Sequence, residues 1–165
     1  MEPSQLRLFD LLPRRRRPAA AERPPRIEPR GRCCDLSALA AEVNQRWFGG
    51  ELTAAITWGR RRPRRRRRHG RFARPRRVSM QLGSFHQEQD LVRIHPALDR
   101  PWVPRFVLES VIYHELLHAA LPPVRDGGRR RVHTPEFKRR ERLFPQLAAA
   151  QRWIRENLGR LVETA

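Results

Sequence analysis

The stretch Tyr113-His114-Glu115-Leu116-Leu117-His118 lies inside an apolar run with helical spacing, from Phe106 to Leu121. Side chains four residues apart lie on one face of an α-helix, so His114 and His118 can direct one imidazole nitrogen each toward the same point. Two neutral imidazoles at about 2.0–2.1 Å suit zinc. Glu115 lies about 100° further round the helix, which places it to act on a water molecule at the metal rather than to bind the metal. The stretch therefore predicts a metal site on a helix.

Packing is the alternative role for these two histidines, because a short motif can occur by chance and a histidine on an apolar face often hydrogen-bonds a carbonyl instead. Two features of the sequence favour the metal site. Both histidines share their helix face with Phe106, Ser110 and Leu121, and a third histidine, His133, follows in the chain. A catalytic zinc takes three protein ligands and leaves one position open for water.

The third ligand is His133 or a carboxylate. His133 immediately precedes a predicted helix start, in which Thr134 is the N-cap, Pro135 is the first helical residue and an acidic residue lies in the first turn. The alternative carboxylate ligands are Glu109, Glu136 and Glu141. The other histidines are interpreted as turn, strand-end or arginine-loop residues: His86, His95 and His69.

The 165-residue chain has the length of one domain and an extreme charge. Its formal net charge is +19, because 36 basic residues are opposed by 17 acidic ones. Such a charge indicates an anionic partner such as nucleic acid. Lys138 is the only lysine, so GC-rich codon usage is a second explanation for the many arginines, but it leaves the charge in place.

Cysteine usage and hydropathy predict a soluble intracellular protein. Cys33 and Cys34 are adjacent, which argues against a disulfide framework or a cysteine-based zinc site. The N-terminal residues Glu2 and Asp10 flank a short apolar patch that runs into the arginines 14–17, a pattern unlike a signal peptide. No apolar stretch reaches the length of a membrane span. We expect a cytoplasmic, nucleoid-associated protein without membrane contact.

The chain divides into an arm and a domain. Residues 1–32 are expected to be a disordered basic arm, because prolines recur among the arginines. Residues 33–165 are expected to form one α+β domain. Its predicted helices cover residues 36–48, with Asp35 as N-cap, and residues 106–121, 135–144 and 147–158. Its predicted strands cover residues 52–58, 78–85 and 91–95.

An arginine-rich loop at residues 60–77 separates the first two predicted strands. No acidic residue occurs from Leu52 to Gln87, and a block of like charges cannot be buried, so we expect a solvated loop. Arginines contact phosphates and no base-reading motif is present, which predicts non-specific DNA binding. The candidate nucleic-acid-binding residues are Arg60, Arg61, Arg62, Arg64, Arg65, Arg66, Arg67 and Arg68.

Three motifs occur in order along the chain: Asn44-Gln45-Arg46-Trp47-Phe48-Gly49-Gly50-Glu51-Leu52, His114-Glu115-Leu116-Leu117-His118 and His133-Thr134-Pro135-Glu136-Phe137. Together they resemble the SprT-like family of HExxH zinc metallopeptidases, which includes Spartan and its bacterial relatives. The resemblance implies a zincin-like core, in which a small sheet of three or slightly more strands packs on the HExxH helix. It further implies zinc as cofactor, His114, His118 and His133 as its ligands, and Glu115 as the general base.

The resemblance also implies a function. It suggests a zinc-dependent endopeptidase that acts at or near DNA in DNA repair, on DNA-crosslinked or DNA-bound proteins lying along the sheet edge. The zinc ribbon that follows the protease core in some family members is absent here. Two alternatives are a metal-dependent nuclease and a catalytically silent nucleic-acid-binding protein braced by zinc. Glu115 and the long gap between His118 and His133 argue against the nuclease, and a catalytically silent protein would leave Glu115 unused.

The predicted arm contains an apolar cluster, Gln5-Leu6-Arg7-Leu8-Phe9. It resembles the Gln-Leu-x-Leu-Phe peptide by which bacterial proteins dock on the sliding clamp of DNA polymerase, through Gln5, Leu6, Leu8 and Phe9. Exposed apolar side chains in a disordered arm gain nothing from folding, so a partner groove is a natural explanation for them. The alternative is that residues 6–12 fold back onto the protein's own core.

Overall fold

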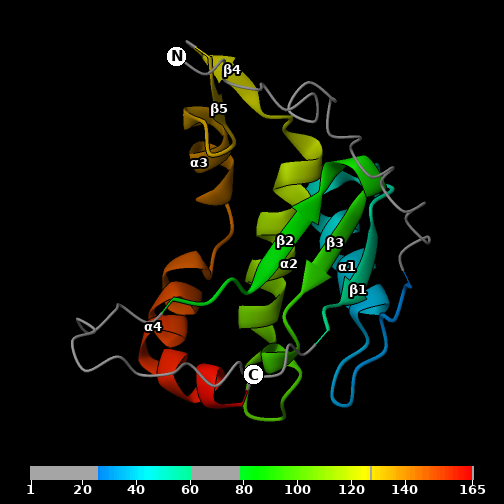
Figure 1. Cartoon of the computed structure of the whole chain (residues 1–165), viewed down its shortest axis with the longest axis vertical. Coiled ribbons are helices and arrows are strands. Elements are labelled where there is room, and N and C mark those ends of the chain that lie inside the picture. Colours follow the sequence, from blue (N-terminus) through cyan, green and yellow to red (C-terminus); the bar gives the residue numbers. More distant parts are fainter. Residues whose placement is uncertain (1–25, 61–78, 127, 165) are drawn as a thin grey trace, which may run out of the picture.

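The computed structural model describes residues 26–60, 79–126 and 128–164. The predicted clamp motif in the arm and the arginine loop beyond Arg60 therefore lie outside the described residues. Along the chain (Figure 1), the elements are α1 (Leu36–Phe48), β1 (Ala55–Trp58), β2 (Gly83–His86), β3 (Leu91–Ile94), α2 (Arg105–Ala120), β4 (Val124–Asp126), β5 (Arg129–Arg131), α3 (Pro135–Glu141) and α4 (Leu147–Glu163). Two short 3-10 helices follow β2 and β3: η2 (Gln87–Gln89) and η3 (Pro96–Leu98).

A three-stranded sheet forms in the order β1-β3-β2. Strand β1 runs parallel to β3, and β2 runs antiparallel to it. Strands β2 and β3 contact α2, and β2 is the edge strand on that side (Figure 1). Within the described part of the chain, four α-helices and this small sheet make a mixed α+β fold, as the sequence predicted.

The strands are shorter than predicted. Strand β1 begins at Ala55 rather than Leu52, because the Asn44 side chain already satisfies the backbone of Leu52. The Asn44 Nδ2 donates to the Leu52 carbonyl (2.8 Å), and the Leu52 N–H donates to Asn44 Oδ1 (3.3 Å). Strand β2 begins at Gly83 and extends to His86, because His86 pairs in register with Leu91. The prediction placed His86 in a turn.

A β-hairpin occupies residues 124–131, where the sequence analysis predicts neither a helix nor a strand. Strands β4 and β5 pair antiparallel, with Arg125 opposite Arg130. Gly128 in the turn has φ +79°, a backbone conformation that glycine adopts without the steric cost of a side chain. Three-residue strands rich in arginine carry no apolar alternation, so no strand pattern was visible there in the sequence.

Helix α2 is the central element of the core. It contacts α1, the sheet, α3 and α4, and its buried side chains include Val107, Ile112 and Leu117. The predicted N-caps are both confirmed: the Asp35 carboxylate accepts from the Ser37 N–H (2.8 Å), and Thr134 Oγ1 accepts from the Phe137 N–H (3.1 Å). These caps define the first turns of α1 and α3.

Residues 26–32, which the sequence assigned to the arm, are hydrogen-bonded to the domain. The Glu28 N–H donates to Thr57 Oγ1 (2.8 Å), and the Trp58 N–H donates to the Glu28 carbonyl (3.0 Å). The Asp99 carboxylate accepts from the backbone N–H groups of Arg32 and Cys33. No helix within the described residues is long and apolar enough to cross a membrane.

Candidate metal centre

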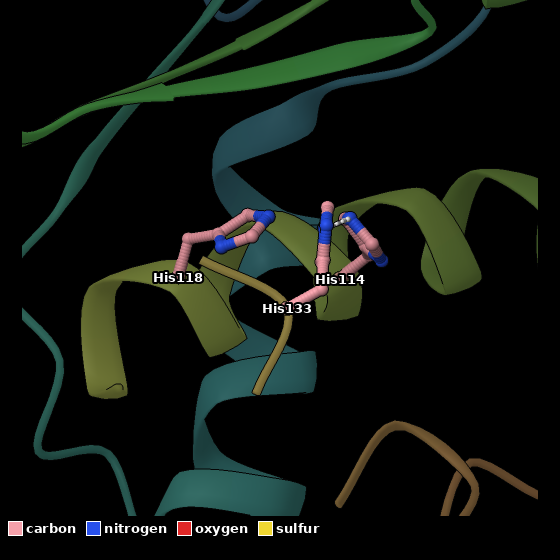
Figure 2. A group of neighbouring side chains, drawn as sticks. All are labelled: His114, His118 and His133. Carbon is pink, nitrogen blue, oxygen red and sulfur yellow. Dashed lines mark hydrogen bonds between the residues drawn. The ribbon is translucent and has the colours of Figure 1, made fainter. Parts of the chain in front are cut away.

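Three histidines converge at one end of the cleft beside α2. His114 and His118 lie one turn apart on α2, and His133 approaches them from the segment between β5 and α3 (Figure 2). One ring nitrogen of each lies within 4.8 Å of the others, and the Nε2 atoms of His114 and His133 are 3.3 Å apart. Tetrahedral zinc at 2.0–2.1 Å from each nitrogen requires nitrogen separations of about 3.3–3.4 Å. The three imidazoles are therefore close enough to hold a metal ion.

Phe137 supports all three imidazoles. Its ring is fully buried, and its centroid lies 5.1 Å from that of His114, 4.5 Å from that of His118 and 4.9 Å from that of His133. Phe137 follows the capped start of α3, so docking of α3 also carries His133 to the other two histidines. The sequence analysis placed Phe137 in a motif but assigned it no role at the site.

Glu141 holds His114 in one orientation. The Nδ1–H of His114 donates to Glu141 Oε1 at 2.7 Å, which leaves Nε2 directed at the other two histidines. Such a carboxylate partner selects the tautomer of a metal-binding imidazole and raises its basicity. The sequence analysis considered Glu141 only as a direct ligand. Its spacing four residues after Phe137, on the same face of α3, was the available signal for this role.

The other candidate carboxylate ligands have different partners. Glu109 pairs with Arg105, with Arg105 Nε 2.7 Å from Glu109 Oε1. Glu136 accepts from both Arg139 and Arg140. Among the described residues, the group close enough to hold a metal comprises the three histidines without these carboxylates.

Glu115 is buried beneath the edge strand. Its side chain is only 6% exposed, and a Cβ atom at Gly83 would come within 2.5 Å of Glu115 Oε1. Burial raises the pKa of Glu115 from 4.5 to about 7, against the opposing effect of a hydrogen bond from the Phe85 backbone. Glu115 also lines the cleft that the three histidines line. A carboxylate with a pKa near neutrality can both accept and release a proton there.

Two of the imidazoles are held in the neutral form that binds metals. Burial, followed by the charges of His114 and His133, lowers the pKa of His118 to about 4. Burial is also the main cause that lowers the pKa of His133. A neutral imidazole offers its nitrogen lone pair to a metal without first losing a proton.

The cleft has a volume of about 600 Å³ and runs along the outer edge of β2, which pairs with no strand in the described part of the chain. The His95 N–H donates to the Leu82 carbonyl at 2.8 Å, so the backbone polar groups of Leu82 point toward β3. The backbone N–H and C=O groups of successive residues in a strand point to opposite sides. Those of Gly83 and Phe85 therefore point away from β3, toward the outer edge of β2. The Phe85 backbone meets Glu115 there. The opposite wall includes the apolar residues Leu147 and Ile154 of α4.

Other predicted residues lie apart from the metal group. His86 Nε2 is 3.2 Å from Ser84 Oγ, and His95 Nδ1 accepts from the Ala97 N–H (3.1 Å), as strand-end residues can. Tyr113 packs against Phe144, and its hydroxyl donates to the Arg140 carbonyl (2.7 Å), so it is a core residue. The candidate nucleic-acid residue Arg60 is exposed, whereas the remaining arginines of its block and His69 lie outside the described residues.

Comparisons with models of protein families, with curated proteins and with solved structures found no match to this chain. The residues of the site and their geometry are therefore the basis for the proposals that follow.

We predict that the purified protein binds one zinc ion per chain. His118→Ala and His133→Ala should lose the metal, because two imidazoles hold zinc far less tightly than three, whereas Glu115→Gln should keep it. Elemental analysis after dialysis measures all four proteins. Full zinc content in His133→Ala would show that another group is the third ligand.

Removing the carboxylate behind His114 should weaken metal binding without abolishing it. Glu141→Ala is expected to lower zinc affinity by about 10–100-fold, the usual effect of losing the partner of a metal-binding histidine. Competition with a chelating dye measures the affinity. Glu136→Ala is the matched control, because it makes the same change on the same helix at a carboxylate that accepts from Arg139 and Arg140. Equal affinities in the two variants would remove Glu141 from the site.

The buried Glu115 should destabilise the metal-free protein at neutral pH. The folded state keeps its proton up to pH of about 7, whereas the unfolded state releases it near pH 4.5, so ionisation opposes folding across this window. Glu115→Gln should therefore match the parent near pH 4.5 and exceed its free energy of unfolding by about 3 kcal/mol above pH 7. Urea unfolding in chelator at several pH values tests this. A difference that does not change with pH contradicts it.

Proposed function

We propose that the protein is a zinc-dependent endopeptidase of the SprT-like kind, with a zincin-like arrangement of sheet and HExxH helix. One observation carries the proposal: three convergent histidines and the buried Glu115 line a single cleft along β2, which is an edge strand among the described residues. A binding protein braced by a metal needs neither the cleft nor the carboxylate. A hydrolase needs both.

Zinc is the metal that this donor set fits best. Three imidazoles without a thiolate or a carboxylate ligand leave a fourth position open, which is the pattern of catalytic zinc sites. Zinc at such a position supplies a Lewis acid that polarises a carbonyl group and makes water acidic. The ligands would be His114, His118 and His133. Glu141 would keep the His114 ring oriented so that Nε2 points toward the metal position.

Glu115 supplies the proton transfers that peptide hydrolysis requires. Its carboxylate accepts a proton from the attacking water and then delivers that proton to the amide nitrogen that leaves. Glu115 lines the same cleft as the three histidines, which places the carboxylate where such a proton is exchanged. The hydroxyl of Tyr113 is engaged with Arg140 and takes no part.

An extended polypeptide fits the open edge of β2. The outward backbone groups of Gly83 and the carbonyl of Phe85 can pair with a substrate strand, since only the Phe85 N–H is engaged with Glu115. The apolar side chains of α4 face this strand from the opposite wall. Gly83 has no side chain, so the substrate backbone can lie close above Glu115. An added strand would thus bring a peptide carbonyl over the metal position.

The high positive charge supports a location on DNA, with DNA-bound or DNA-crosslinked proteins as substrates. A metal-dependent nuclease is the competing function that the same charge would suit. Hydrolysis of a phosphodiester can also use Glu115 as a base, but it leaves the outer edge of β2 without an occupant among the described residues. The peptidase therefore uses more of the observed site.

Glu115→Gln should lower cleavage of a DNA-bound protein by at least about 100-fold, because it removes the proton acceptor but not the metal ligands. A chelator should have the same effect on the parent protein. The assay follows the substrate protein by gel electrophoresis, with single-stranded RNA as a parallel substrate. Glu156→Gln on the exposed face of α4 is the control for loss of one carboxylate.

Full proteolytic activity of Glu115→Gln would remove Glu115 from the mechanism. Chelator-sensitive degradation of the RNA without any proteolysis would instead favour the nuclease.

A further inference from the structure

A basic hollow of about 610 Å³ adjoins the metal centre. It is formed by the end of β5, the segment that carries His133, and α3 with the residue that follows it. Among the described residues, its lining contains four basic side chains and no carboxylate: Arg131, Lys138, Arg139 and Arg142. Val132, His133 and Pro135 complete it.

The basic side chains are exposed, and some are held in place. Lys138 and Arg142 are four residues apart and therefore lie on one face of the helical turn. Arg139 donates through Nε (2.8 Å) and Nη2 (2.7 Å) to the two carboxylate oxygens of Glu136, which lies outside the hollow. A guanidinium fixed in this way loses less conformational freedom when it binds an anion.

The hollow and the catalytic cleft share a wall. Val132 and His133 line both. Figure 1 shows the hairpin β4–β5 beside α3, at the C-terminal end of α2. An anion in the hollow would therefore lie next to the metal position.

We infer that this hollow binds the phosphodiester backbone of nucleic acid. Guanidinium groups match the paired oxygens of a phosphate, and duplex DNA presents one negative charge per about 1.7 Å along its axis. An acidic polypeptide offers a sparser and more flexible row of charges to the same side chains. The nucleic-acid site is thus placed within the folded domain, on residues separate from the arginine block of the loop.

The inference extends the proposed function, since it would hold DNA within reach of a protein engaged in the cleft. The binding itself does not depend on catalysis. A binding experiment can therefore fail or succeed independently of any peptidase assay.

The first test compares two double variants of the full chain. K138Q/R142Q removes two charges from the hollow, and R152Q/R155Q removes two from the exposed face of α4. Fluorescence anisotropy with a labelled 20-base-pair duplex gives the dissociation constant at several salt concentrations. K138Q/R142Q should reduce the slope of log affinity against log salt by about 1.8, since each lost phosphate contact contributes about 0.9. R152Q/R155Q should keep the parent slope.

The second test needs no variant, because Lys138 is the only lysine of the chain. Acetylation of Lys138 by an amine-reactive reagent, followed by mass spectrometry, reports its accessibility. Duplex DNA should slow this reaction several-fold at low salt and not at high salt. A free lysine peptide in the same mixture controls for the reagent, and polyglutamate serves as the competing polyanion.

Three results would overturn the inference. The first is an unchanged slope of log affinity against log salt in K138Q/R142Q, and the second is an equal decrease of this slope in both double variants. The third is protection of Lys138 by polyglutamate but not by DNA. If the inference holds while Glu115→Gln retains full proteolytic activity, the nucleic-acid site stands and the proposed function does not.

Discussion

The buried ring of Phe137 is the contact on which the metal centre depends. A helix places His114 and His118 one turn apart by its own geometry, but nothing in α2 determines where His133 lies. Phe137 packs beneath all three imidazoles, and Glu141, one turn further along α3, holds His114 from behind. The docking of α3 on α2 and the assembly of the three-histidine group are therefore one event, and a change that loosens α3 should loosen both.

Phe137 stabilises the fold and the metal site together, whereas Glu115 lowers the stability of the fold. A carboxylate buried under a strand costs free energy when it ionises. A well-packed apolar side chain would make the protein more stable at this position. The fold accommodates it through the absence of a side chain at Gly83 and through a hydrogen bond from the Phe85 backbone. Such an arrangement is expected where proton transfer, rather than packing, determines the residue.

The sequence predicted the helices and the metal group well, because both depend on local spacing and end signals. Asp35 and Thr134 marked helix starts correctly, and the four-residue repeat of His114 and His118 required no tertiary information. The hairpin β4–β5 was missed, since its short arginine strands have no apolar alternation. The role of Glu141 was also missed, because whether a carboxylate binds a metal or supports a ligand depends on a distance between helices.

X-ray absorption at the zinc edge of the purified protein tests the central claim most directly, because it counts and identifies the ligands in solution. The account predicts three imidazole nitrogens and one further light atom at about 2.0–2.1 Å, with the multiple scattering that imidazole rings produce. The same shell should lose one imidazole in His133→Ala. A sulfur ligand, a shell dominated by carboxylate oxygens, or an unchanged spectrum in His133→Ala would contradict it.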